Sequence, residues 1–309
     1  EHGEYGDFGQ QWIEDNDAGS GPYTLSERNR SESLIFAKFE DWWGERPEGD
    51  TYETVKINLG REVSTIAGQM KQETADITDS WLPLDVYNDI GNQDHGRVDE
   101  DPSLDPFIVF MNMQREPLTD INVRKALAAG FPYEQAINDV FPGSNRLWGP
   151  MPQSYDHAVD KEDLLTFSQD LEQAETFIEQ SDYSADEINV TYEYFSSFTK
   201  QENLGLLMQS TYDQLGINFE VTGTPWTKVA EKAQDPSTSP QMFALWNAQR
   251  FIDSDEILYS NWHSSMMNTY SNGSKYENEE IDQLLEEGRT TLDTERREEI
   301  YQEVQHKVC

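Results

Sequence analysis

The sequence has only one cysteine, Cys309, in a chain of 309 residues. A single thiol can form no internal disulfide and supplies too few ligands for a thiolate metal cluster. The five histidines lie far apart without the spacing of metal ligands, and we expect them at the surface. We therefore predict no metal site and no cofactor.

Basic residues are also scarce. The chain has 22 Lys and Arg against 60 Asp and Glu, which gives a formal net charge of -38. Such a surface repels phosphate backbones, so nucleic acid is not an expected partner. Aromatic residues at 12% and hydrophobic residues at 36% are enough for a folded core. Because molar salt shortens the Debye length to about 3 Å and screens self-repulsion, we expect a salt-loving source.

Long apolar runs are absent, and so are the commoner enzyme motifs. No run of about 18 apolar residues could span a membrane. The sequence contains no G-x-S-x-G, no phosphate loop and no G-x-G-x-x-G, which argues against the enzyme classes that use them. The first ten residues lack a signal-peptide pattern, and the last nine lie within a helical pattern. We therefore expect a chain that is incomplete at both ends.

The length allows two lobes, because single cores stop growing near about 250 to 300 residues. Residues 94–106 are polar and acidic, carry two prolines, and precede the apolar run FIVFMNM at 107–113. We place the boundary there and predict two parts, 1–106 and 107–309. The first part contains a predicted strand at 54–59 and a predicted helix at 64–71.

The second part alternates strands with helices. Helical spacing occurs at 122–130, 133–140, 168–180 and 201–215, after Pro225, and twice beyond Asn278. Alternating or apolar patterns predict strands at 189–195, 217–221 and 242–246. Strands separated by helices of this length indicate crossover connections and a partly parallel sheet. The predicted fold class is therefore α/β.

Several motifs occur in an order that resembles the family 5 extracellular solute-binding proteins of ABC importers, the dipeptide, oligopeptide and nickel-binding type. They are GSGPY (19–23) with Trp42 and Trp43, TADI (74–77), PLTDINVRKALAAGF (117–131), LGINFEV (215–221), FALWNA (243–248) and the segment 275–305. The resemblance implies a two-lobed periplasmic-binding-protein-like fold of type II, cluster C. Residues 1–106 would be part of lobe I and 107–309 most of the second, C-terminal lobe.

The resemblance also implies a function without catalysis. The protein would capture a peptide-like or oligosaccharide solute outside the cell and deliver it to an ABC permease. It would act at the extracellular face of the membrane, lipid-anchored through a missing N-terminal segment. The alternatives are a secreted glycoside-processing enzyme and a sensory or adhesion module that reuses the fold.

The ligand contacts that the resemblance implies differ here in two places. Relatives that bind free peptides have an Asp three residues after a strand-ending Trp, where this chain has Gln249 after Trp246. Dipeptide-binding relatives have an Arg in the loop after the strand 189–195, where Lys200 is the nearest cation. A buried ammonium without its counter-charge costs several kcal/mol, so we expect an uncharged or singly charged ligand. The candidate walls are Trp246, Trp148, Trp226, Tyr194 and Phe198, and the candidate polar contacts are Asn112, Asn247, Gln249 and Arg250.

Overall fold

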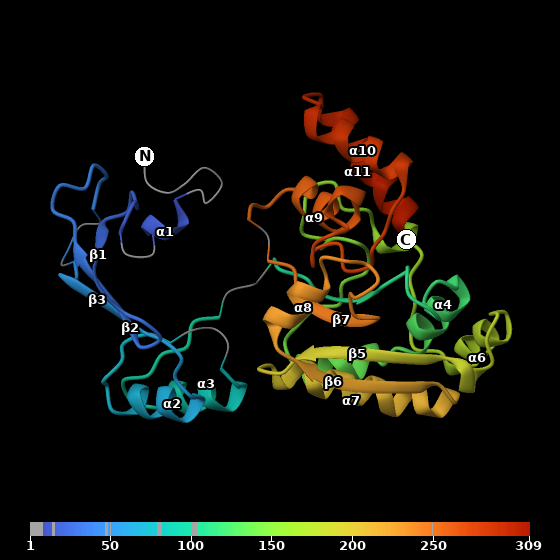
Figure 1. The fold of residues 1–309 in the computed structure, drawn as a ribbon, viewed down its shortest axis with the longest axis horizontal. Helices are drawn as coiled ribbons and strands as arrows, with labels where there is room; N and C mark the ends of the chain where they lie inside the picture. Colours follow the sequence, from blue (N-terminus) through green and yellow to red (C-terminus); the bar gives the residue numbers. More distant parts are fainter. Residues whose placement is uncertain are drawn as a thin grey trace. The chain divides into compact units, whose positions relative to one another are not determined.

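The computed structural model describes residues 9–13, 16–46, 49, 51–78, 82–100, 104–248 and 250–309. The chain divides into two compact units, Glu1–Asp101 and Pro102–Cys309, which we call unit 1 and unit 2 (Figure 1). The division falls within the polar segment 94–106. No helix in the described part of the chain is long and apolar enough to cross a membrane.

Unit 1 is built around a small antiparallel sheet with the strand order β1-β2-β3. The register of β1 against β2 shifts by a bulge between Leu25 and Glu27. The predicted strand at 54–59 and the predicted helix at 64–71 are confirmed as β3 and α2. The elements are α1 (Gln10–Ile13), β1 (Tyr23–Asn29), β2 (Ser33–Lys38), β3 (Thr54–Asn58), α2 (Val63–Lys71) and α3 (Leu84–Gly91).

Unit 2 contains a mixed sheet with the strand order β4-β7-β5-β6. Strand β5 pairs in parallel with β6 and with β7, whereas β4 pairs antiparallel with β7. The α/β class and the partly parallel sheet are thus confirmed. The strands are β4 (Phe107–Met111), β5 (Asn189–Phe195), β6 (Asn218–Thr224) and β7 (Met242–Trp246).

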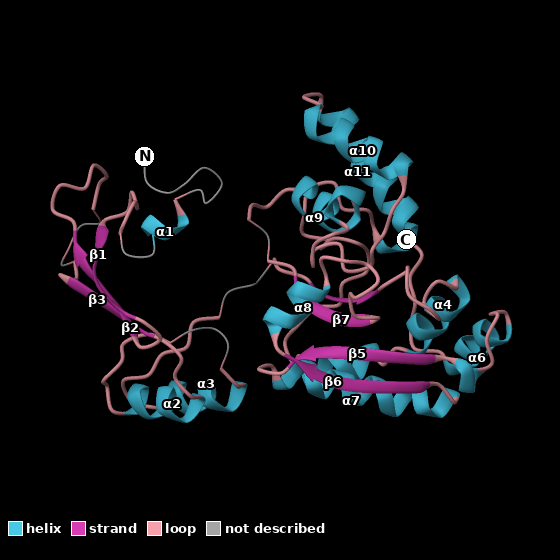
Figure 2. Cartoon of the chain, viewed as in Figure 1, coloured by secondary structure: helices cyan, strands magenta, loops and turns pink. Residues whose placement is uncertain are grey.

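Helices connect and cover these strands (Figure 2). Helix α7 ends in a short 3-10 turn before Gly216, whose positive φ of 77° is the left-handed conformation that glycine adopts at little cost. The segment predicted as one helix at 133–140 is a short α-helix, α5 (Tyr133–Gln135), that continues as a π-helix over Ala136–Val140. The other helices are α4 (Ile121–Gly130), α6 (Leu171–Glu179), α7 (Thr199–Tyr212), α8 (Trp226–Lys232), α9 (Ser254–Trp262), α10 (Glu279–Thr290) and α11 (Thr294–Val308).

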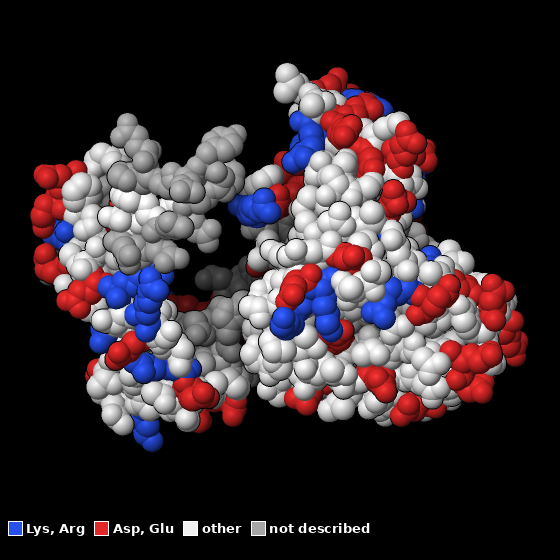
Figure 3. Space-filling model, viewed as in Figure 1, with Lys and Arg blue, Asp and Glu red and all other residues white. Residues whose placement is uncertain are grey.

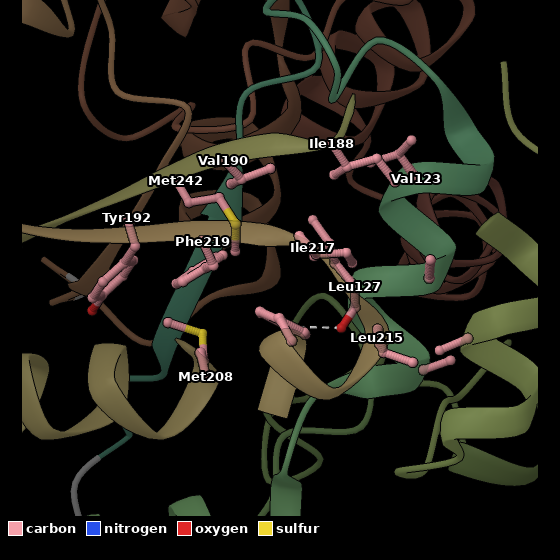
Figure 4. Close-up of a cluster of buried hydrophobic side chains, with 14 of the residues drawn as sticks. Val123, Leu127, Ile188, Val190, Tyr192, Met208, Leu215, Ile217, Phe219 and Met242 are labelled. Carbon is pink, nitrogen blue, oxygen red and sulfur yellow. Dashed lines mark hydrogen bonds between the residues drawn. The ribbon is translucent and has the colours of Figure 1, made fainter. Parts of the chain in front are cut away.

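The main core of unit 2 lies between the sheet and helices α4, α6 and α7 (Figure 4). Tyr192, Met208 and Phe219 are at most 3% exposed there. The Tyr212 hydroxyl donates to the Leu127 carbonyl at 2.9 Å, so its one polar group is satisfied inside the core. Alternate residues of β5 face this core, which is why the sequence alternates along that strand.

The opposite face of the sheet carries a smaller cluster of Phe110, Phe195, Val229 and Phe243. A Cβ on Gly273 would lie 2.5 Å from the Phe110 ring, so only glycine lets this loop lie against the sheet. Both faces of the sheet are therefore covered, so we look for a binding site at the edge where the strands end.

Candidate binding site at one edge of the sheet

The strand directions bring several chain segments to one edge of the sheet of unit 2. Strands β5, β6 and β7 are parallel, so their carboxyl ends, at Phe195, Thr224 and Trp246, lie at the same edge. Strand β4 runs the other way and pairs its first residue, Phe107, with Trp246. Ligands of open α/β sheets bind beyond the carboxyl ends of the strands, so this edge is the candidate site.

Seven aromatic side chains meet at this edge, and we call them the aromatic edge: Phe107, Phe141, Phe195, Phe198, Trp226, Trp246 and Tyr270. The Trp246 ring lies 4.5 Å from Phe107, 5.7 Å from Phe198 and 6.1 Å from Phe141 between centroids. These separations are those of favourable aromatic pairs. The rings therefore hold one another in place before any ligand arrives.

A second group of rings continues the aromatic edge along the sheet. Phe195 lies 6.2 Å from Phe198 and 4.9 Å from Trp226, and Trp226 lies 4.9 Å from Tyr270. Trp226 is half-buried and Tyr270 is 41% exposed, so each ring keeps accessible surface. Trp246 and Phe198 are half-buried as well. Partly accessible, mutually packed rings can cover apolar ligand surface without rearranging.

Two basic side chains follow the strands that end at this edge. The Lys200 ammonium lies 6.0 Å from the centre of the Phe141 ring, at the start of α7. The Arg250 side chain is 77% exposed and lies 3.6 Å from the carboxylate of Glu256. Both cations can reach solvent, so either can meet a ligand anion at small desolvation cost.

A half-buried ion pair ties the helix that carries Trp226 to the sheet. Glu193 of β5 accepts hydrogen bonds from the Lys232 ammonium at 2.7 and 2.9 Å and from the Thr224 hydroxyl at 2.8 Å. Lys232 is the last residue of α8, and Trp226 is the first. The pair thus fixes α8 to the sheet, and a cation at the carboxyl end of the helix is also favourable for its dipole.

Asn247, predicted as a ligand contact, is only 7% exposed and is tied into the strand end. Its side-chain amide donates to the Asn261 side-chain oxygen at 2.7 Å, and its backbone N–H donates to the Pro106 carbonyl at 2.9 Å. Gln249, the other predicted amide contact, lies outside the described residues. Asn247 therefore ties the end of β7 to Asn261 and to Pro106.

Asn112 lies at the opposite edge of the sheet. Because β4 is antiparallel to β7, its last residue, Met111, pairs with Met242 and not with Trp246. Five residues of strand separate the two edges by about 17 Å. Asn112 is fully buried, and its side chain donates to the Pro236 carbonyl and accepts from the backbone of Gln114. The side chain of Asn112 is thus occupied by backbone contacts at the far edge, and we place it outside the site around Trp246.

Two of the predicted aromatic contacts also lie apart from the aromatic edge. Tyr194 faces α7, where burial and a hydrogen bond with Glu202 raise the pKa of its hydroxyl. Trp148 packs with cations, since the Arg146 guanidinium lies 4.0 Å and the Lys161 ammonium 5.0 Å from its ring centre. We therefore leave Tyr194 and Trp148 out of the site.

Sequence reasoning missed four members of the aromatic edge: Phe107, Phe141, Phe195 and Tyr270. Phe195 could have been found, because it ends a predicted strand directly before the loop that contains Phe198. Phe107 begins a strand whose direction the sequence does not reveal. Tyr270 lies in a loop with no periodic pattern, so nothing in the sequence connects it to Trp226.

The histidine prediction is wrong at one position, because His263 is only 6% exposed. Its ring stacks on Tyr259 at 4.1 Å, and its Nδ1 accepts from the backbone N–H of Ser265 at 3.1 Å. Among the residues that the structure describes, no three His, Cys, Asp or Glu side chains are grouped so as to hold a metal ion. The aromatic edge itself offers ring surface, and the exposed cations Lys200 and Arg250 follow β5 and β7 in the chain.

The chain belongs to a known family. Residues 4–269 match the family described as "Bacterial extracellular solute-binding proteins, family 5 Middle". This is a family of binding proteins and not of enzymes. The match confirms the resemblance that the ordered sequence motifs indicated.

Individual relatives are similar at low identity. The chain is 24% identical over 307 residues to the probable D,D-dipeptide-binding periplasmic protein DdpA of Escherichia coli, covering 97% of this chain and 56% of that protein. It is 21% identical to the periplasmic oligopeptide-binding protein OppA of E. coli, covering 97% of this chain and 55% of OppA. The chain thus spans about half the length of these curated relatives.

The fold is also that of solved binding proteins. The structure of DppA from Helicobacter pylori in complex with peptide STSA matches with a TM-score of 0.81 at 20% identity. The match covers 98% of this chain and 59% of that one. This similarity establishes the fold and leaves the ligand of the present chain to be argued from its own residues.

Proposed function

We propose that this chain captures a peptide-like solute outside the cell for an ABC importer, and that the aromatic edge of unit 2 contacts the solute. The observation that carries the proposal is the meeting of seven aromatic rings at the carboxyl ends of β5, β6 and β7. An ABC permease in the membrane is the partner that the family implies. Units 1 and 2 are assigned to lobe I and to the second lobe, respectively.

A peptide-like solute is favoured over an oligosaccharide. The relatives DdpA and OppA are named as dipeptide- and oligopeptide-binding proteins, and DppA carries the peptide STSA. The Lys200 ammonium lies 6.0 Å from the centre of the Phe141 ring. We propose that the Lys200 ammonium pairs with the solute carboxylate. We assign no acidic side chain to the solute amino group.

The test is calorimetric titration with four ligands: the peptide Ser-Thr-Ser-Ala, its N-acetylated form, its C-terminal amide, and maltotriose. We expect acetylation to change the affinity by less than about twofold and amidation to weaken it by about fivefold, the loss of one exposed ionic contact of about 1 kcal/mol. Binding of maltotriose with no binding of any peptide would replace the proposed solute class by oligosaccharides.

The site itself is tested by Trp246→Ala. We expect binding to weaken by at least about tenfold while the circular dichroism spectrum is unchanged, since the Trp246 ring is half-buried and its partner rings remain packed. The control is Tyr183→Ala, which removes a ring that precedes β5 and hydrogen-bonds Glu116, away from the carboxyl ends of the strands. Loss of the folded state in Trp246→Ala would show that this ring belongs to the core.

Two further expectations concern the setting of the protein. Acidic side chains gather on the visible face near α6, α10 and α11 (Figure 3), in keeping with the net charge of -38. We infer a salt-rich environment. The test is the unfolding midpoint, which should rise from low to molar salt because salt screens the repulsion between acidic side chains.

We also propose a lipid anchor at the extracellular face of the membrane. Mass spectrometry of the membrane-bound protein tests it.

A further inference from the structure

Unit 2 contains a buried lysine, Lys275, that has no part in the site described above. The residue is 1% exposed. Its ammonium donates hydrogen bonds to three carbonyl oxygens, those of Ala233 at 2.7 Å, Met267 at 2.8 Å and Thr269 at 2.7 Å. A lysine ammonium has three N–H groups, so every donor of Lys275 has an acceptor.

The three carbonyls belong to two segments, and each segment carries one ring of the aromatic edge. Ala233 caps the carboxyl end of α8, whose first residue is Trp226. Met267 and Thr269 belong to the loop that presents Tyr270. The Trp226 and Tyr270 rings meet edge to face at 4.9 Å with an interplanar angle of 72°. One ammonium thus connects the two segments whose rings form this pair.

Local chemistry alone does not favour a lysine at this position. Burial lowers the pKa of Lys275 to about 8, because desolvation disfavours the charged form. The backbone of Lys275 has a φ of 53°, in the left-handed region that favours glycine. A glycine would relieve the backbone, and an apolar residue would avoid the buried charge. The three hydrogen bonds are what the lysine adds.

We propose that Lys275 is a positioning residue of the solute site, whose three carbonyl hydrogen bonds hold Trp226 and Tyr270 in the pairing that the solute contacts. The role in solute binding rests on the function proposed above. The role in pairing the two rings can be tested without any solute, so the two proposals can fail separately.

Other hydrogen bonds hold the loop around Lys275 in its place within unit 2. The side chain of Asn272 donates to the Tyr276 carbonyl and accepts from the Tyr276 N–H, each at 2.9 Å. The Ser274 carbonyl accepts from the Met113 N–H at 2.9 Å. Removing the ammonium is therefore expected to loosen the ring pair while the loop stays docked.

The first measurement uses the chain labelled with 5-fluorotryptophan and observed by fluorine NMR, with Trp226→Phe to assign the Trp226 resonance. In Lys275→Met we expect the Trp226 resonance to shift or broaden toward its position in Tyr270→Ala, while the resonance of Trp148 stays in place. The matched control is Lys228→Met, which removes an exposed ammonium from α8, the helix that carries Trp226. An unchanged Trp226 resonance in Lys275→Met overturns the proposal.

The second measurement is the affinity for Ser-Thr-Ser-Ala, which we expect to fall by about tenfold in Lys275→Met and to be unchanged in Lys228→Met. A moved Trp226 resonance with unchanged affinity overturns the positioning role. If Lys275→Met fails to fold, Lys275→Gln, which keeps an N–H donor, is measured in its place. Failure of both variants to fold would make Lys275 a core residue and also overturns the proposal.

Discussion

The two sheets of this chain show how differently strands of similar length can be supported. In β1, β2 and β3 of unit 1, the buried residue among those described is Ser33, and the large side chain of Ile57 is 45% exposed. In unit 2, by contrast, Tyr192 and Phe243 are fully buried in β5 and β7. The difference lies in what covers the strands, because β propensity reflects packing on a half-buried surface more than an intrinsic backbone preference.

The comparison also indicates why the site can be argued within unit 2. Its sheet is covered by helices on one face and by α8 and the loop at Gly273 on the other. A rigid scaffold of this kind can hold side chains at its edge within a fraction of an ångström. The stability of unit 2 should therefore depend on a few buried residues, whereas substitutions on the sheet of unit 1 should have small effects.

The largest expected effect tests this contrast directly. Phe243→Ala removes a fully buried ring from β7 and should lower the free energy of unfolding by about 3 to 5 kcal/mol. The matched change in unit 1 is Ile57→Ala on β3, where a residue that is 45% exposed should cost less than about 1 kcal/mol. Urea denaturation followed by circular dichroism measures both, and equal losses would contradict the contrast.

The next effect concerns the buried charge of Lys275. Its pKa is lowered to about 8 in the folded chain from 10.5, so between these pH values the unfolded state binds more protons. The free energy of unfolding should therefore rise with pH over this window, by at most about 3 kcal/mol, and be constant below it.

Comparison with Lys275→Met isolates that contribution, since all other titratable groups are common to both proteins. Unfolding in urea at several pH values between 7 and 10 is the measurement. Parallel pH profiles for the two proteins would show that Lys275 does not titrate in this range.

A smaller effect is expected from the half-buried ion pair of Arg297 and Asp253, which joins α11 to the start of α9. Its nearest N and O atoms lie 2.6 Å apart. Burial of Asp253 opposes ionisation, but hydrogen bonds from Arg297 and from the Asp255 N–H hold the pKa of Asp253 below its usual value. Arg297→Met should cost about 1 to 2 kcal/mol at pH 7, between the values for exposed and buried pairs.

The sign of its pH dependence follows from the lowered pKa of Asp253. The stabilisation is present above the unfolded pKa and is lost as pH falls through the folded pKa, so the difference from Arg297→Met should shrink below about pH 4. The counterpart in unit 1 is the exposed pair Arg97 and Asp99. Arg97→Met should leave the unfolding midpoint unchanged, and a loss equal to that of Arg297→Met would argue against burial as the cause.

A small effect is also expected for the pair of Lys38 and Glu53 in unit 1, whose charged atoms lie 3.1 Å apart with Glu53 75% exposed. The hydrogen bond that the Lys38 ammonium donates to this carboxylate raises the pKa of Lys38. Glu53→Gln should shift the unfolding midpoint only slightly in low salt and not at all in molar salt, because salt screens exposed pairs. A shift that persists in molar salt would mean that the pair is protected from solvent.

The sequence by itself determined much of the local structure. The alternation NVTYEYF predicted β5 with both bounds as observed, and the strand at 242–246 was predicted equally well. Asp253 and Asp293 directly precede α9 and α11, and their side chains accept from backbone N–H groups there as N-caps do. These features depend on residues close together in the chain, and such patterns can be read directly.

The tertiary structure alone decided which of these residues meet. The antiparallel direction of β4 brought Phe107 to Trp246 and placed Asn112 at the far edge. The face of β5 that α7 covers separated Tyr194 from Phe198. Phe107 and Trp246 are more than a hundred positions apart in the chain, and the free energy of their contact depends on how whole elements pack. A periodic sequence pattern records which residues are buried, but it does not record their partners.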